Sequence, residues 1–327
     1  MRLSFGIPVF FAAAVSLSAQ SPAALAQARA GDDTVAPSQL KPLFVQFEET
    51  LAPRLVGADD AASRWISGRL STLEPSVQAR DYAAALARQP KELLFVASLA
   101  DVCSRTSGMA ECADRDVVGY WAARDADNAV PWLLQAERAR RRNNLPSLVD
   151  NLDRASRSGR YDTYDHRAGA VLWSKLAPAT PAAERGAAAL YAVDATSIPG
   201  APMQALSDVC SPQGRALDAR IGAACERLAA LMAERASLLS DRRAGTQIAL
   251  AAAAGEGAKS SAGERARAVV AQQDRCREAL QALERAAVGA PDQRQQAAAL
   301  GEQFVTVRAR DGEASACDAL ARALPPR

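Results

Sequence analysis

The sequence predicts an all-α protein in which antiparallel helical hairpins stack on one another and disulfides link the helices. Alanine occupies 76 of the 327 positions, and small helix-forming residues let helices approach one another closely. Larger apolar residues recur at intervals of three and four, and no sustained alternation bounded by turn residues predicts a strand. Six cysteines are the third observation, because an even number in an oxidising compartment implies disulfides.

The N-terminus has the features of a secretory signal peptide. Met1-Arg2 is a short charged region, and an uncharged, mostly apolar run follows over Leu3–Leu17. Ala26-Gln27-Ala28 places small residues at the −3 and −1 positions of a cleavage site. We therefore expect residues 1–28 to be removed near Ala28 and the mature chain to be periplasmic or secreted. The alternative is an N-terminal membrane anchor, for which the apolar run is short. We expect no transmembrane segment in the mature chain.

Composition divides the mature chain into four regions. Residues 29–45 contain glycine, aspartate and proline and predict a flexible lead-in. Helical periodicity over residues 46–196 predicts a first helical domain. The proline- and glycine-rich segment 197–202 predicts a linker, and residues 203–327 then form a second helical domain. It stays open whether the two helical blocks form one solenoid or two domains.

Capping signals define the first helices of the mature chain. Asp59-Asp60 precedes an apolar pattern that contains Trp65 and Ile66, and Pro75 ends it. Residues 82–99 continue the helical spacing. These segments predict short, consecutive helices.

The clearest helical pattern is a hairpin. Val117, Val118 and Trp121 lie on one face of a helix that the segment 125–128 interrupts. This segment also caps a helix predicted at Val130–Arg142, Asn143-Asn144 predicts a tight turn, and the returning helix runs over Leu145–Ser156.

The residues of this hairpin resemble a tetratricopeptide repeat (TPR), a helix–turn–helix unit of about 34 residues. The matching positions are Trp132, Ala136 and Ala155. Three other positions differ from the consensus, which has Tyr, Phe and Pro where this chain has Ala139, Leu152 and Arg160. The resemblance covers one degenerate repeat, at about residues 125–160. It implies a TPR-like α-helical solenoid whose grooves bind protein or peptide segments, and it implies no catalytic residue.

Helices are also predicted along the rest of the chain. The expected helices are Thr163–Leu176, Pro181–Val193, a short helix that ends at Cys210, Asp218–Leu239, Glu264–Val288 and two shorter C-terminal helices. Glycines and serines between 255 and 263 predict a loop.

The cysteines allow 15 different pairings. Turn residues between the two cysteines of each pair favour Cys103–Cys112 and Cys210–Cys225 as bridges within hairpins. The remaining pair, Cys276–Cys317, would link a long helix to the C-terminal one. On one continuous helix Cys210 and Cys225 would lie about 22 Å apart, too far to bond. That pairing therefore predicts a helix break between them. The alternative is that some of the six are free thiols in the core.

Composition also excludes several kinds of site. A balance of 39 basic and 37 acidic residues gives no electrostatic footprint for nucleic acid. The chain has one histidine and no C-x-x-C pair, so multi-histidine metal sites and zinc ribbons are excluded. We expect neither a metal nor another cofactor, and we assign no catalytic residue.

His166 near Asp162 and Asp165 could be half of a general-base arrangement. The pattern favours the alternative, a half-exposed histidine at a helix start beside solvent-facing acids.

Candidate partner-binding residues lie at and beyond the end of the first hairpin helix. Arg138 and Arg140–Arg142 form the one notable basic cluster. It fits either a helix C-terminus whose cations complement the helix dipole or a patch for acidic partners or anionic headgroups. Tyr161 and Tyr164 fit either packing at a helix end or a binding platform. The candidates for a partner surface are Arg138, Arg141, Arg142, Tyr161 and Tyr164.

These features predict an exported binding or scaffold protein that uses a helical-repeat surface to hold a protein or peptide partner in the cell envelope. The expected surface is the groove beside the helices Val130–Arg142 and Leu145–Ser156. One alternative is a hydrolytic enzyme that acts on cell-wall or extracellular material, and another is a structural envelope protein. A carboxylate or His166 with a perturbed pKa in a cleft would favour the enzyme.

Overall fold

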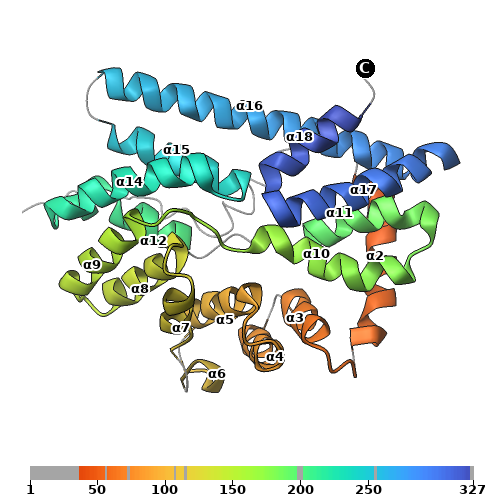
Figure 1. Cartoon of the computed structure of the whole chain (residues 1–327), viewed down its shortest axis with the longest axis horizontal. Helices are drawn as coiled ribbons and strands as arrows, with labels where there is room; N and C mark the ends of the chain where they lie inside the picture. Colours follow the sequence, from red (N-terminus) through yellow and green to blue (C-terminus); the bar gives the residue numbers. More distant parts are fainter. Residues whose placement is uncertain are drawn as a thin grey trace, which may run out of the picture. The chain divides into compact units, whose positions relative to one another are not determined.

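The fold is taken from a computed structural model of the chain (Figure 1). It describes residues 37–55, 57–71, 74–106, 108–113, 116–196, 202–253 and 256–324. The chain divides into two units, Met1–Ala36 and Pro37–Arg327, and all described residues belong to the second. The expected signal peptide, its cleavage site near Ala28 and most of the expected linker at 197–202 lie outside the described residues.

The part of the chain that the structure describes is helical and contains no strand, which confirms the all-α prediction. The first half forms α2 (Pro37–Leu55), α3 (Ala61–Leu70), α4 (Pro75–Arg88), α5 (Leu93–Arg105), α6 (Ala110–Ala113), α7 (Val117–Arg124), α8 (Ala129–Arg141) and α9 (Leu145–Ser156). The second half forms α10 (Asp165–Leu176), the 3₁₀ helices η1 (Ala177–Ala179) and η2 (Ala182–Glu184), α11 (Arg185–Thr196), α12 (Pro202–Val209), α13 (Pro212–Arg215), α14 (Ala219–Arg235), α15 (Leu239–Ala252), α16 (Glu256–Ala287), α17 (Pro291–Asp311) and α18 (Glu313–Ala323).

Helices that are close in the chain pack as neighbours in space. From α3 to α9 each helix contacts the next, apart from the short α6, and α9 then packs against α14. The series continues through α15 and α16 to α17 and α18, and α17 packs against α10 and α11. Because α10 also contacts α3, the helices close a circuit, and the segment 157–164 runs through its middle (Figure 1).

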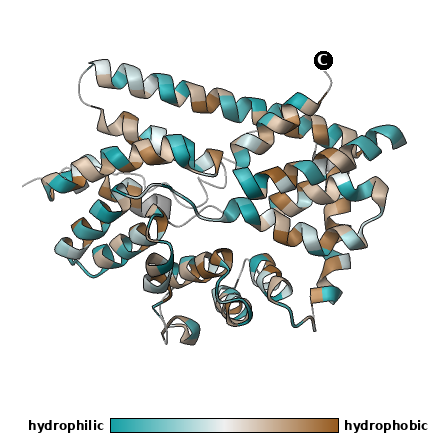
Figure 2. Cartoon of the chain, in the orientation of Figure 1, coloured by the Kyte–Doolittle hydropathy of each residue, from teal (hydrophilic) through white to brown (hydrophobic). Residues whose placement is uncertain are grey.

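Small residues allow close helix contacts in this circuit, as the alanine content predicts. A Cβ atom added to Gly186 of α11 would lie 2.8 Å from Cβ of Ala297 in α17. A Cβ atom added to Gly301 of α17 would lie 2.8 Å from Cβ of Ala189 in α11. Larger side chains fill the core elsewhere: α5 is buried along most of its length and is apolar on several sides (Figure 2).

Among the described helices, none combines the length and apolar character needed to cross a bilayer.

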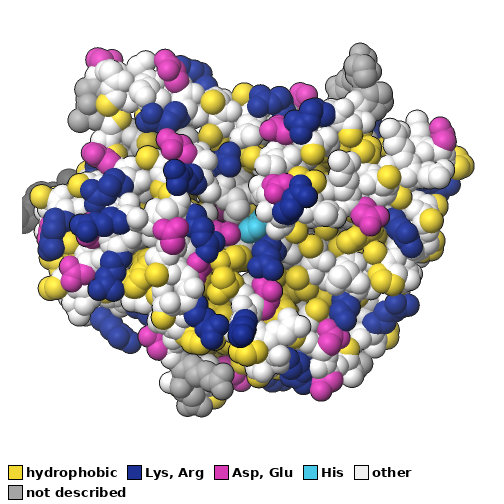
Figure 3. All heavy atoms as spheres, in the orientation of Figure 1, with side chains coloured by type: hydrophobic (Ala, Val, Ile, Leu, Met, Phe, Trp, Pro, Cys, Tyr) yellow, Lys and Arg dark blue, Asp and Glu magenta, His cyan; other side chains and the backbone are white. Residues whose placement is uncertain are grey.

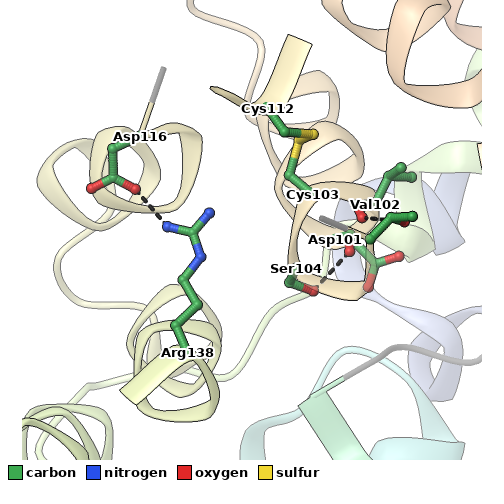
Figure 4. Close-up of a disulfide and its surroundings, with 8 residues drawn as sticks. Asp101, Val102, Cys103, Ser104, Cys112, Asp116 and Arg138 are labelled. Atoms are coloured by element: carbon green, nitrogen blue, oxygen red, sulfur yellow. Dashed lines mark hydrogen bonds and ion pairs between the residues drawn. A yellow bond between two sulfur atoms is a disulfide. The ribbon is translucent and has the colours of Figure 1, made fainter. Parts of the chain in front are cut away.

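The six cysteines form the disulfides that the spacing favours: Cys103–Cys112, Cys210–Cys225 and Cys276–Cys317. The first joins α5 to α6 across a turn in which Gly108 has a φ of +89° (Figure 4). The second spans the expected helix break, which contains α13. The third ties α16 to α18. All three pairings are therefore confirmed.

Local capping signals are also confirmed. Asp60 caps α3, because its carboxylate accepts a hydrogen bond from the backbone N–H of Ser63 at 3.0 Å. Asn128 caps α8 through the N–H of Val130 at 3.2 Å. Asn143 has a φ of +54° in the tight turn between α8 and α9. The α8–α9 hairpin thus begins and ends where the sequence predicts.

Three boundary predictions are wrong. Residues 37–45 of the expected flexible lead-in are helical, because Leu40, Phe47 and Leu51 form a buried stripe that packs α2 onto the core despite its prolines. The loop expected at 255–263 is the start of α16 from Glu256 onward. The helix expected over Asp218–Leu239 ends at Arg235, and α15 begins at Leu239.

Candidate functional site

Two groups of charged side chains are candidates for function. The first is the arginine cluster at the C-terminal end of α8, formed by Arg138, Arg140, Arg141 and Arg142 with the carboxylates Glu137 and Asp116. The second is the central polar cluster around the segment 157–164, formed by Asp162, Asp165, His166, Asp241, Arg308 and Glu313 with Arg69 and Ser237.

Glu137 organises the arginine cluster. Its carboxylate accepts hydrogen bonds from Nε and Nη2 of Arg140, at 2.6 and 2.9 Å, and from Nε of Arg141 at 2.7 Å. Residues three and four positions apart share one helix face, which brings both arginines to the same carboxylate. Burial opposes ionisation of Glu137, but the hydrogen bonds from the two arginines outweigh it and lower the pKa of the carboxyl.

Two further contacts fix the cluster to neighbouring helices. Nη1 of Arg141 donates to the carbonyl oxygen of Ser104 in α5 at 2.7 Å. Nη1 of Arg138 lies 2.7 Å from Oδ1 of Asp116, which caps α7 (Figure 4). Arg142 is exposed, and its positive charge contributes to the lowered pKa of Asp116. Arg138, Arg140 and Arg141 are therefore held in place by their side-chain contacts and also reach solvent.

The arrangement leaves positive charge at the surface in a fixed geometry. Glu137 is only 7% exposed, whereas the side chains of Arg140 and Arg141 are 41% and 50% exposed. Guanidinium groups that are ordered before binding lose less entropy when they pair with a carboxylate or phosphate. The groove expected beside the hairpin is partly occupied, because α12 contacts α8 and α14 packs along α9. The arginine cluster is thus the accessible part of the expected binding surface.

The two tyrosine candidates lie inside the protein. Tyr161 and Tyr164 are both buried. The hydroxyl group of Tyr164 donates to Oδ2 of Asp125 at 2.9 Å and accepts from Nη2 of Arg160 at 3.0 Å. Neither ring is available to a partner, which corrects their assignment to the binding surface and agrees with the packing alternative.

Asp162 anchors the central polar cluster. Its Oδ1 accepts hydrogen bonds from the backbone N–H of Tyr164 at 2.8 Å and from Oγ of Ser237 at 3.1 Å, and it lies 3.2 Å from Nδ1 of His166. Burial raises the pKa of this carboxyl, but the contacts with His166, Tyr164 and Ser237 outweigh burial, so the pKa is lowered. Asn128 holds the backbone of Asp162 at both its N–H and its carbonyl oxygen.

Two buried arginines bind the start of α10. Nη2 of Arg69 lies 2.9 Å from Oδ1 of Asp165, and Nη1 of Arg308 donates to the carbonyl oxygens of Asp165 and His166, both at 3.1 Å. Burial raises the pKa of Asp165 even though Arg69 opposes the shift. Burial also lowers the pKa of Arg308. These contacts join α3 and α17 to α10.

In the central polar cluster, Asp241 of α15 is a carboxyl for which none of the interactions that shift its pKa favours the charged form. It is 6% exposed, and its Oδ2 has no hydrogen-bond partner. Burial, followed by the negative charges of Asp165, Glu313 and Asp162, raises the pKa of Asp241 to about 7. The carboxyl is therefore partly protonated near neutral pH.

The order of contacts in the central polar cluster differs from a hydrolytic triad. In a Ser–His–Asp triad the histidine lies between serine and carboxylate and takes the serine proton. Here the carboxylate of Asp162 lies between Ser237 and His166. His166, the one histidine of the chain, is 7% exposed and visible in cyan near the middle of the face in Figure 3. It lies at the start of α10 as expected, but it is buried rather than half-exposed, and the side chains of Asp162 and Asp165 beside it are mostly buried.

Sequence reasoning missed five members of the central polar cluster: Arg69, Ser237, Asp241, Arg308 and Glu313. None of them carries a local motif, and each reaches the cluster from a helix or turn far away in the chain. In the described parts of the chain, His, Cys, Asp and Glu side chains form no group that could hold a metal ion.

The chain was compared with protein-family models, curated proteins and solved structures. None of the three comparisons found a match.

Proposed function

We propose that this protein is an exported binding or scaffold protein that holds an acidic protein or peptide segment against the arginine cluster of α8. In this proposal the α8–α9 hairpin is a TPR-like repeat, and the helices before it continue the repeat as a solenoid. The serial packing of α3 to α9 supports that arrangement. The disulfides support export, because such bonds persist in oxidising compartments.

One observation carries the proposal. A buried carboxylate, Glu137, holds the two exposed guanidinium groups of Arg140 and Arg141 side by side. Arg138 and Arg142 add positive charge on the same helix end. A carboxylate-rich segment would meet ordered donors and a positive field, which favours both encounter and specificity.

The test uses fluorescent oligoglutamate as the probe and the oxidised chain as the receptor. The binding variant is R138Q/R142Q, which removes two charges but leaves the Glu137 contacts intact. The matched control is R265Q/R267Q, which removes two exposed charges from α16. We expect the binding variant to weaken affinity at least tenfold and the control to change it less than threefold.

Varying the salt concentration gives this test a second readout. Affinity for oligoglutamate falls as ionic strength rises, because exposed charges are screened. Equal affinity for the binding variant and the control would contradict the proposal, as would undetectable binding by a folded wild-type chain.

A hydrolytic enzyme acting on cell-wall or extracellular material is the second candidate. It is favoured by the opposite pKa shifts of two carboxyls in the central polar cluster, with Asp162 lowered and Asp241 raised to about 7. Enzymes use environments that shift the pKa values of two carboxyl groups in opposite directions, so that one group acts as an acid and the other as a base. The test is turnover of cell-wall fragments by the wild type and by D241N. Turnover by the wild type that D241N abolishes would support it, and no turnover would contradict it.

A further inference from the structure

The start of α18 holds the turn between α14 and α15. The backbone N–H of Glu313 donates to the carbonyl oxygen of Ser237 at 2.8 Å, and Oε2 of Glu313 accepts from the N–H of Leu239 at 2.7 Å. Ser237 in turn donates from Oγ to Asp162 in the segment 157–164. A chain of hydrogen bonds therefore connects α18, the α14–α15 turn and the central segment.

Asp241 lies in the first turn of α15, directly beside this chain of hydrogen bonds. Three carboxyl groups act on it from three different elements: Asp165 from α10, Glu313 from α18 and Asp162 from the central segment. Among the described residues, no charge that acts on Asp241 comes from α14 or α16, the long helices packed beside α15. An ionised Asp241 would therefore add like charge to a buried acidic group.

Other ionisable groups around Asp241 have their own contacts. Tyr161 is buried, and Asp241 contributes to the raised pKa of its hydroxyl. His166 lies against Asp162, and Arg308 binds the carbonyl oxygens at the start of α10. Arg242, the next residue of α15, donates to a backbone carbonyl, and the charges that act on it are those of Asp318 and Glu313.

We propose that the central polar cluster is a proton-sensitive latch, in which a neutral Asp241 keeps α15 and α18 closed on the segment 157–164 and an ionised Asp241 loosens them. Loss of the proton places a buried negative charge, with an unpartnered oxygen, next to Glu313 and Asp162. Repulsion then acts on the two residues whose hydrogen bonds connect α18, the α14–α15 turn and the central segment. The affected elements are the first turns of α15 and α18.

The direction of the pH effect follows from proton linkage. The pKa of Asp241 is about 7 in the folded chain, against about 3.9 for an unfolded aspartate. Between these values the folded form binds more protons, so its stability is full at low pH and falls as pH rises through the folded pKa. One such group changes the opening constant by up to about tenfold per pH unit, and the change levels off above pH 7 or so. Asp162, whose pKa is lowered, acts in the opposite direction and only in acid.

The test is hydrogen exchange of the full oxidised chain between pH 5.5 and 8.5, corrected for the intrinsic exchange chemistry. The wild type, D241N and the control D150N are compared, where Asp150 is an exposed aspartate on α9. We expect the opening constants of the first turns of α15 and α18 to rise about fivefold between pH 6 and 7 in the wild type and in D150N. In D241N, which keeps the shape and removes the charge, the profile is flat.

A second variant and the shape of the wild-type profile also test the latch. Glu313→Gln removes one negative charge beside Asp241. We therefore expect the midpoint of this variant's pH profile to lie below that of the wild type, shifted by a measurable fraction of a pH unit toward the ordinary aspartate pKa. A flat wild-type profile overturns the latch, and so does a D241N profile that matches the wild type.

Discussion

The arginine cluster is built from residues three and four positions apart on α8, whereas the central polar cluster joins residues up to 143 positions apart. The first depends mainly on one helix and faces solvent. The second depends on the closure of the whole helix circuit and is buried. Charge near the surface is therefore free to serve recognition, while buried charge controls how the helices hold together.

The largest effect is expected from Arg308→Met. The substitution removes the donor that binds two carbonyl oxygens at the start of α10. We expect a loss of about 3–5 kcal/mol in the free energy of unfolding, because the hydrogen bonds from α17 to α10 are lost and the buried carboxyl of Asp165 loses a nearby positive charge. Denaturant unfolding checks this, with Arg310→Met as the control, since Arg310 is exposed and pairs with the adjacent Asp311. Equal stabilities of the two variants would show that the central polar cluster does not hold α17 to α10.

A smaller, pH-dependent loss is expected from Asp162→Asn. At pH 7 the variant weakens the contacts with Ser237 and His166, and we expect a loss of about 2 kcal/mol. Because the pKa of Asp162 is lowered, its stabilisation is present above the ordinary pKa and is lost as pH falls through the folded value. The difference between variant and wild type therefore narrows below about pH 4. Unfolding curves at pH 7 and pH 3 measure it, and a constant difference would refute the assignment.

Glu137→Gln tests the local cluster. It replaces charge-assisted hydrogen bonds to Arg140 and Arg141 with neutral ones, and we expect a loss of about 1 kcal/mol. The two arginines are partly exposed, so salt should reduce the effect. Thermal unfolding at low and high salt measures it against Glu278→Gln, an exposed glutamate on α16. A loss as large as that of Arg308→Met would erase the distinction between the two regions.

The smallest effect is expected for the ion pair between Arg138 and Asp116. Both side chains reach solvent, so the coupling energy should be about 0.2–1 kcal/mol. A double-mutant cycle with Arg138→Gln and Asp116→Asn separates this coupling from the role of Asp116 as the cap of α7. A coupling above about 2 kcal/mol would mean that the pair behaves as a buried one.

Local signals predicted the parts of the fold that depend on neighbouring residues. The α8–α9 hairpin, the caps Asp60 and Asn128 and the three disulfide pairs follow from spacing, turn residues and helix geometry. The start of α16 was missed because glycine and serine are typical of loops, although Ala262, Val269 and Cys276 recur on a buried face.

Long-range contacts were not predictable in this way. Arg69 meets Asp165 across 96 positions, and nothing in either neighbourhood indicates the pairing. Asp241 looks like an ordinary polar residue in an amphipathic helix, and only tertiary packing buries it. Tyr161 and Tyr164 were ambiguous for the same reason, since an aromatic pair near a helix end fits both packing and binding until burial is known.

The most direct measurement of the division between the two regions is a hydrogen-exchange map of the oxidised chain with and without oligoglutamate at low salt. We predict protection at the C-terminal end of α8 and at the end of α5 that Arg141 contacts. We predict no change at the start of α10 or α15. Protection at α10 and α15 with none at α8 would place ligand binding in the central polar cluster and contradict the proposed function.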